Sequence, residues 1–351
     1  MAHNLTIRKD GTVEFAYVKE NPWHGLGKYL GGEPITREVM LREAGLDWTV
    51  ELRPLMYPIP ADAKYQVVES HVATIRADTN ELLGLVSKDY KPIQQREAFD
   101  FMDRLVEAAG GAHYETAGSL KGGQQVFALV KLPEVIEVTR QDLVGQYLLL
   151  VNGHDGGHAF RCGFTPIRVV CDNTLSASLA RWERSLQDWV TVRHVGDVPA
   201  KVEEARRILG LSVKFFQVAG EYYRRMSLRD IDAAGARAYF ESVLPLPDRL
   251  QPADEASDSE RGRNLIRLDQ ARQTHQLLVQ LFDGEASGGS LPGVRGTLWG
   301  AYNAVTEYVD HVRGATRKGE PRRGAFEGAV MGEGARIKQR AFDEAMAILK
   351  N

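Results

Sequence analysis

Strand-like and helix-like segments are segregated along this chain, and the segregation limits the folds it can adopt. Before about residue 198, runs of β-branched and aromatic residues are separated by turn residues, as in 65–78 and 81–87. After Pro199 the apolar residues recur at helical spacing, as in 201–226. A doubly wound parallel sheet needs strands and helices in alternation, so the pattern predicts an α+β fold.

Three regions follow from this pattern. Residues 1–60 are predicted to form an N-terminal arm with a short helix and a strand, and 61–198 an antiparallel α+β core. Residues 199–351 are predicted to be all helical, with a basic, Gly-rich segment at 312–340. The predicted architecture is therefore a β-rich N-terminal part with packed helices, followed by a helical C-terminal part.

Local signals place two elements inside the core. Apolar residues at helical spacing from Gln95 to Ala109, followed by Gly110-Gly111, predict a helix with a clear end. The Gly-Gly pair after Lys121 predicts a hairpin between strands at 113–120 and 124–132.

Composition and motifs exclude several classes of protein. The net charge is −3, so a nucleic-acid partner would have to bind a local basic patch. No apolar run is long enough to span a membrane, and two cysteines suit a reducing compartment, so a cytoplasmic location is expected. Phosphate-binding loops of the known Gly-rich types are absent, so no nucleotide cofactor is expected.

The segment Val151–Ser178 concentrates groups that could carry chemistry. His154, Asp155 and His158 could ligate a metal, but Gly153, Gly156 and Gly157 predict a turn, which does not place the histidines on one helical face.

Its two cysteines offer a second interpretation. Cys162 or Cys171 could act as a nucleophile with His154 or His194 as the base, although free cysteine is usually a core residue. The preferred interpretation of the segment is a turn between two buried strands, with no metal ligands and no catalytic residues assigned.

Basic, aromatic and amide residues in the β-rich half suggest a nucleic-acid site instead. Cations can neutralise phosphates, and an aromatic ring can stack on a base without sequence preference. The candidates are Lys88, Tyr90, Lys91, Arg96, Lys121, Arg161, Arg168 and Asn173. If the arginines on the strand after the turn are buried, each needs an acidic residue or a phosphate as its partner.

Several long motifs resemble those of a known family. They include LGLVSKDYKPIQQREAFDF, GSLKGGQQVFALVKL and YLLLVNGHDGGHAFRCGFTPIRVVCDNTL. These motifs resemble the phage/plasmid-like protein family, domain-of-unknown-function family 932. The resemblance implies an origin in a phage, plasmid or other mobile genetic element, and it supplies no catalytic residues.

A more distant resemblance concerns the order of elements. A hairpin, the extended stretch KDYKPIQ, a helix and further antiparallel strands resemble the β-β-β-α core of Rad-fifty-two-type single-strand annealing proteins. That resemblance implies binding of single-stranded DNA, annealing in DNA recombination without ATP, and a homo-oligomer in the form of a ring or filament.

Three functional hypotheses remain from the sequence. The preferred one is a non-enzymatic, cytoplasmic single-stranded-DNA-binding protein of a mobile element. The second is a metal-dependent or hydrolytic nucleic-acid enzyme centred on His154, Asp155 and His158. The third is an interaction protein that counters host defence, with the basic segment 312–340 as its docking element.

Overall fold

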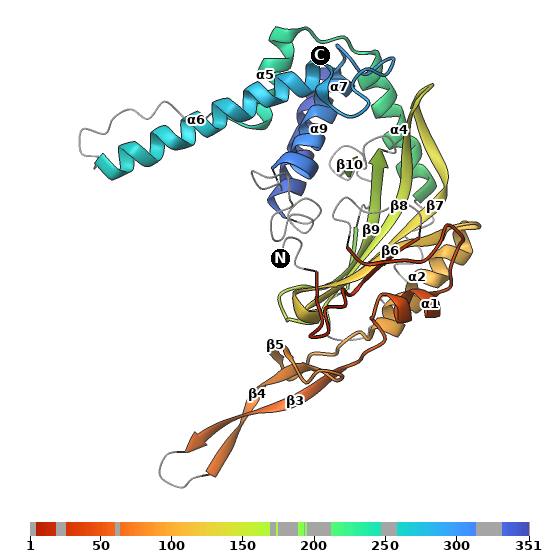
Figure 1. Cartoon of the computed structure of the whole chain (residues 1–351), viewed down its shortest axis with the longest axis vertical. Helices are drawn as coiled ribbons and strands as arrows, with labels where there is room; N and C mark the ends of the chain where they lie inside the picture. The colour runs from red at the N-terminus through yellow and green to blue at the C-terminus, as the bar shows by residue number, and fades with distance from the viewer. Residues whose placement is uncertain are drawn as a thin grey trace. The chain divides into compact units, whose positions relative to one another are not determined.

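The fold is α+β, as the sequence predicts, with antiparallel sheets in the N-terminal half and most helices in the C-terminal half (Figure 1). It is seen in a computed structural model. The structure describes residues 5–18, 26–59, 64–168, 173–174, 189–192, 194, 212–246, 258–313 and 332–350.

The chain divides into two compact units. The first contains Met1–Glu134, Gln146–Thr165 and Leu179–Phe215, and the second contains Val135–Gly145, Pro166–Ser178 and Phe216–Asn351. The second unit therefore combines the C-terminal helices with two short pieces of the β-rich half.

One large sheet has the strand order β10-β9-β8-β7-β6-β1-β2, with β11 paired to β9. Strand β1 pairs in parallel with β2, whereas the β1–β6, β6–β7, β9–β10 and β9–β11 pairs are antiparallel. The strands are β1 (Phe15–Tyr17), β2 (Lys28–Tyr29), β6 (His113–Leu120), β7 (Gln125–Thr139), β8 (Asp142–Gly153), β9 (Phe160–Arg168), β10 (Asn173–Thr174) and β11 (Trp189–Val192).

The predicted hairpin around Lys121 is confirmed. A short 3-10 turn, η1 (Lys121–Gly123), joins β6 to β7. Lys121 and Gly122 both have positive φ, of 55° and 72°, a backbone conformation in which glycine is not strained.

A smaller antiparallel sheet has the order β3-β4-β5, and it confirms the predicted hairpin of 65–78 with 81–87. Its strands are β3 (Val50–Ile59), β4 (Lys64–Arg76) and β5 (Leu82–Ser87). Strands β3 and β4 continue together beyond the end of β5 (Figure 1). Most side chains on this extension are exposed.

Two helices accompany the sheets of the first unit. Helix α1 (Arg37–Glu43) begins at Thr36, whose hydroxyl accepts the Val39 N–H. Helix α2 (Gln95–Ala109) has the bounds that the sequence predicts. It packs its apolar side into the core, where the ring of Phe99 stacks on that of Tyr114 at 5.6 Å between centroids.

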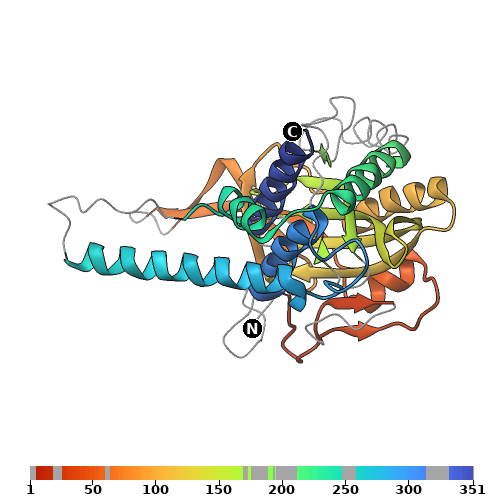
Figure 2. The ribbon, with the colours of Figure 1, turned by 90° about the horizontal axis from the view of Figure 1, so that it is seen from above.

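The second unit is built around an aromatic core. The rings of Tyr223 and Trp299 lie 5.0 Å apart, and those of Tyr302 and Phe342 lie 6.1 Å apart. The helices are α4 (Ser212–Leu228), α5 (Ala233–Val243), the long α6 (Asp258–Gln280, Figure 2), α7 (Leu298–Glu307) and α9 (Glu333–Lys350). Single π-helical turns follow α6 at Leu281–Glu285 and α7 at Tyr308–Val312.

The end of the basic segment 312–340 is helical. Helix α9 begins at Glu333, and its buried face includes Ile337, Phe342 and Met346. Residues 314–331 lie outside the described part of the chain. In the described part, no helix is both long enough and apolar enough to cross a membrane.

Candidate nucleic-acid interface

Four of the predicted nucleic-acid residues lie on one stretch, 88–96, between the end of β5 and the first turn of α2. The side chains of Lys88, Lys91 and Arg96 are exposed there. Neither Lys88 nor Arg96 forms an ion pair with another described residue. The charges of Lys88 and Arg96 therefore remain available to an anion from outside the chain.

Hydrogen bonds at the start of α2 fix the C-terminal end of this stretch. The Glu97 carboxylate accepts the Gln94 N–H at 2.9 Å, so the first turn of the helix is capped. The Gln94 side chain also bonds both backbone groups of Val50, each at 2.9 Å. The side chain thus joins the first residue of β3 to the start of α2.

Tyr90 anchors the middle of the stretch 88–96 to the protein core. It is only 7% exposed, its hydroxyl donates to the Gly153 carbonyl at 3.0 Å, and its ring stacks on His194 at 4.7 Å. The Lys91 N–H donates to the His194 carbonyl at 2.6 Å. The structure therefore places Tyr90 as a buried support, with one ring face covered by His194.

A buried polar cluster contacts the stretch 88–96. We define this cluster as Trp48, Gln95, Asn152 and His154. Asn152 Nδ2 donates to the Ile93 carbonyl at 2.8 Å, and His154 Nε2 lies 3.0 Å from Gln95 Oε1. The rings of Trp48 and His154 meet edge to face, with their centroids 5.7 Å apart. Gln95, Asn152 and His154 are completely buried.

The histidine of the cluster is neutral. Burial, with a smaller contribution from His194, lowers the pKa of His154 to about 3. A buried, uncharged imidazole that contacts Gln95 fits a structural role in support of the stretch 88–96.

Some polar atoms of the buried polar cluster lack a hydrogen-bond partner. Among the described residues, Trp48 Nε1, Gln95 Nε2, Asn152 Oδ1 and His154 Nδ1 are buried without a partner. Turning the Gln95 amide would leave Gln95 Oε1 unpaired in place of Nε2, and His154 Nδ1 would still lack a partner. Buried groups of this kind are commonly satisfied by an ordered water molecule.

The NGHDGG turn is confirmed as a loop between β8 and β9. The Asp155 carboxylate accepts the N–H groups of Gly157 and His158, at 2.9 and 3.0 Å, and contacts His158 Nδ1 at 2.7 Å. The backbone of Asp155 lies so close to Gly84 that a Cβ there would be 2.5 Å from the Asp155 oxygen. The loop is therefore packed against β5.

This geometry does not assemble the metal ligands that the second hypothesis needs. His154 points into the buried cluster, whereas the His158 side chain is 41% exposed and bonded to Asp155. No group of three or more His, Cys, Asp or Glu residues in the described ranges is arranged to hold a metal ion. Cys162 is buried, and burial raises the pKa of its thiol, which suits a core residue. Cys171 lies outside the described residues.

The remaining candidates are spread along other strands. Lys121 is half-buried in the β6–β7 turn, and Arg161 on β9 is exposed, so it needs no buried partner. The backbones of Arg168 and Asn173 pair directly between β9 and β10, but the side chains of both lie outside the described part of the structure.

Sequence reasoning missed a buried charge network centred on Arg76. Arg76 is 1% exposed, donates to Glu14 at 2.9 Å and to Asp78 at 2.7 Å, and lies 4.3 Å from the Trp48 ring centroid. Although burial opposes its charge, the bonds to Asp78 and Glu14 raise the pKa of Arg76. An arginine between apolar residues of a strand was the available signal.

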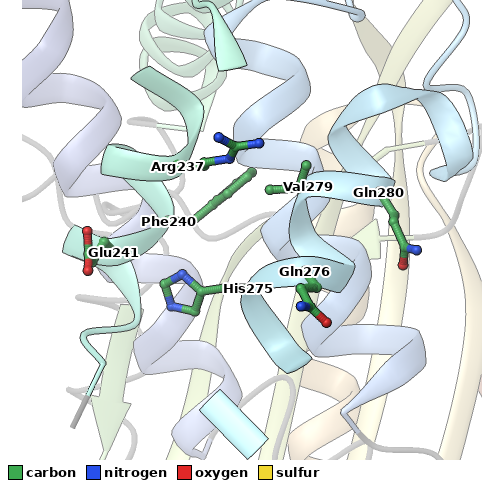
Figure 3. A pocket seen from close by; sticks show the side chains of 7 residues that line it. All are labelled: Arg237, Phe240, Glu241, His275, Gln276, Val279 and Gln280. Atoms are coloured by element: carbon green, nitrogen blue, oxygen red, sulfur yellow. The ribbon is translucent and has the colours of Figure 1, made fainter. Parts of the chain in front are cut away.

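A separate hollow of about 490 Å³ lies between α5 and α6 (Figure 3). None of the residues predicted from the sequence lines it. The lining residues are Arg237, Phe240, Glu241, His275, Gln276, Val279 and Gln280. His275 Nε2 bonds the Leu244 carbonyl at 2.8 Å, which leaves Arg237 and Glu241 as the charged groups of the lining.

Comparison with known proteins identifies the family. A family described as a domain of unknown function, DUF932, matches residues 82–339. The chain belongs to the DUF932 family. The DUF932 match includes the stretch 88–96 and the loop between β8 and β9, but not strands β3 and β4. No curated protein and no solved structure matches the chain.

Proposed function

We propose that this DUF932 chain binds single-stranded DNA and promotes strand annealing without ATP, as a protein of a phage, plasmid or related mobile element. One observation carries the proposal: Lys88, Lys91 and Arg96 are exposed within nine residues whose backbone is bonded to the core, at the Lys91 N–H by His194 and at the Ile93 carbonyl by Asn152. Cations on a backbone that is already fixed can bind phosphates without the cost of ordering the loop that carries them.

The order of elements also supports the proposal. Strands β3, β4 and β5 form an antiparallel sheet, and α2 follows them in the chain. That is the β-β-β-α order of the annealing proteins that the sequence distantly resembles. The exposed positions at the junction of sheet and helix are the ones that would meet the strand.

The role of Tyr90 changes in this proposal. Its ring is packed on His194 and its hydroxyl is bonded to Gly153, so we assign it to the support of the cations. Base stacking, if it contributes, would come from an exposed ring elsewhere. Lys121 and Arg161 remain candidates for further phosphate contacts.

The test is a binding titration with a fluorescent oligonucleotide of 50 or more nucleotides at low salt. We expect the triple variant Lys88→Ala, Lys91→Ala, Arg96→Ala to bind at least tenfold more weakly than the parent. The matched control replaces three exposed cations of α6, Arg263, Arg267 and Arg272, and should bind like the parent. An absence of binding by the parent would end the proposal.

Annealing is measured separately. Two complementary labelled strands should pair faster with the protein than without it, in buffer free of nucleotide. If the protein binds DNA but does not accelerate pairing, the annealing part of the proposal is wrong and the binding part stands.

A further inference from the structure

The β3–β4 hairpin leaves one strand edge open. Strand β4 has 13 residues, but β5 pairs only with His71–Ile75. The Ser70 carbonyl accepts the Lys88 N–H at 3.2 Å. Among the described residues, 64–69 therefore have no ladder partner on the side away from β3.

Proline shows which backbone groups face the open edge. Pro58 lies opposite Tyr65 and has no N–H, so this pair fits the ladder only where no hydrogen bond crosses it. The backbone N–H and C=O of Tyr65, and of Val67 two residues on, then point away from β3. On the other side of the hairpin, Pro58 removes a donor from the outer edge of β3.

Side chains at the same place are apolar and exposed. Met56 lies opposite Val67, and Pro58 opposite Tyr65, so these four share one face of the hairpin. Met56 is 55% exposed, Val67 46% and Tyr65 70%. An isolated two-stranded ribbon is marginally stable in water, and an uncovered apolar edge is a pairing site.

We propose that the open edge of β4 pairs with the same edge of a second copy of this chain. The two strands would be antiparallel about a two-fold axis at Gln66. This register places Tyr65 opposite Val67 of the second copy, and Val67 opposite Tyr65. The edge is thus complementary to itself, which an isologous contact requires.

The neighbouring register is less favourable. An axis at Val67 would place Tyr65 opposite Glu69 of the second copy instead of opposite a β-branched residue. Aromatic and β-branched residues are a stabilising cross-strand pair, and the register at Gln66 forms that pair twice. The proposal concerns the chain alone and does not depend on DNA binding.

Disulfide formation tests the register. In Gln66→Cys, the two cysteines would face each other at Cα separations of about 4.5–5.5 Å, which is within disulfide reach. We expect a covalent dimer after mild oxidation. The matched control is Leu85→Cys on β5 of the same sheet, 56% exposed, which should give no dimer. Equal cross-linking of the two variants would overturn the proposal.

The molar mass in solution gives a second readout. By light scattering at tens of micromolar protein, we expect the parent to have at least twice the chain mass of 39.0 kDa. Tyr65→Lys with Val67→Lys should halve that mass, whereas Leu82→Lys with Leu85→Lys should not. A monomeric parent would overturn the proposal, and so would an unchanged mass of the β4 variant. If the parent is monomeric and only DNA binding responds to the β4 variant, the occupant is nucleic acid.

Discussion

Arg76 and Glu14 lie 62 positions apart in the sequence and form a doubly hydrogen-bonded ion pair whose side chains are 1% and 0% exposed. Arg8 adds a third bond to the same carboxylate at 2.8 Å. The pair joins the end of β4 to the segment just before β1. Because Trp48 contacts both Arg76 and His154, the ion pair is continuous with the buried polar cluster.

Removal of one partner of this ion pair should be costly. Arg76→Met leaves the Glu14 carboxylate buried without its main partner, and we expect a loss of about 3–5 kcal/mol of unfolding free energy. Urea unfolding followed by circular dichroism measures the loss. Arg76→Met combined with Glu14→Met should cost less than the sum of the two single changes. A loss under about 0.5 kcal/mol for Arg76→Met would contradict a stabilising role.

Acidification should destabilise the protein through His154. The pKa of His154 is about 3 in the folded state, because of burial, and about 6.5 in the unfolded chain. Between these values the unfolded state binds the extra proton, so stability falls as the pH decreases from about 6.5. The slope for this group approaches about 1.4 kcal/mol per pH unit.

Urea unfolding at several pH values between 7 and 4.5 tests this linkage. His154→Gln removes the titrating group and should flatten the profile in this range. His158→Gln, which replaces the half-exposed histidine directly after the NGHDGG turn, serves as the matched comparison. Parallel profiles for the parent and His154→Gln would show that His154 is not buried neutral.

The contact between β5 and the NGHDGG loop requires glycine at position 84. A Cβ there would lie 2.5 Å from the Asp155 oxygen, so Gly84→Ala should cost about 1–3 kcal/mol. Gly262 in α6 has nothing within 4 Å of its Cβ position, and Gly262→Ala should stabilise the protein by about 0.5–1 kcal/mol. Thermal unfolding of both variants gives the comparison. A neutral Gly84→Ala would mean that the loop does not pack on β5.

Tyr90 can be assigned to support or to base stacking with one substitution. Tyr90→Phe keeps the ring but leaves the buried Gly153 carbonyl without its donor, so we expect a loss of about 1–3 kcal/mol of stability. If Tyr90 supports the stretch that carries the cations, DNA affinity should also fall in Tyr90→Phe at a temperature where the variant is folded. Because Tyr90→Phe keeps the aromatic ring, an unchanged affinity would favour base stacking over support.

The sequence was sufficient where local signals decide the structure. Helix α2 begins at Gln95, after the Gln94–Glu97 capping box, and it ends before Gly110. The turn at Lys121 likewise follows from its glycines. Caps and turns depend on neighbours in the chain, so a single sequence carries the information for them.

Long-range pairing was beyond a single sequence. Strand β7 continues past Pro133 to Thr139. It pairs with the neighbouring strand β8, and the sequence around Pro133 alone does not predict this pairing. The burial of Arg76 could not be predicted for the same reason, because its partner Glu14 lies in a distant segment of the chain. For the candidate site, the sequence predicted the stretch 88–96 but not the burial of Tyr90, whose ring is covered by the distant His194.

If the exposed cations of 88–96 contact the phosphates of single-stranded DNA, the salt dependence of the affinity must change when they are removed. Each lost contact should reduce the slope of log affinity against log salt by about 0.7, so the Lys88, Lys91, Arg96 triple variant should lose about 2 from the parent slope. The α6 control should keep the parent slope. Equal slopes for the parent and the 88–96 variant would mean that these cations do not contact DNA phosphates.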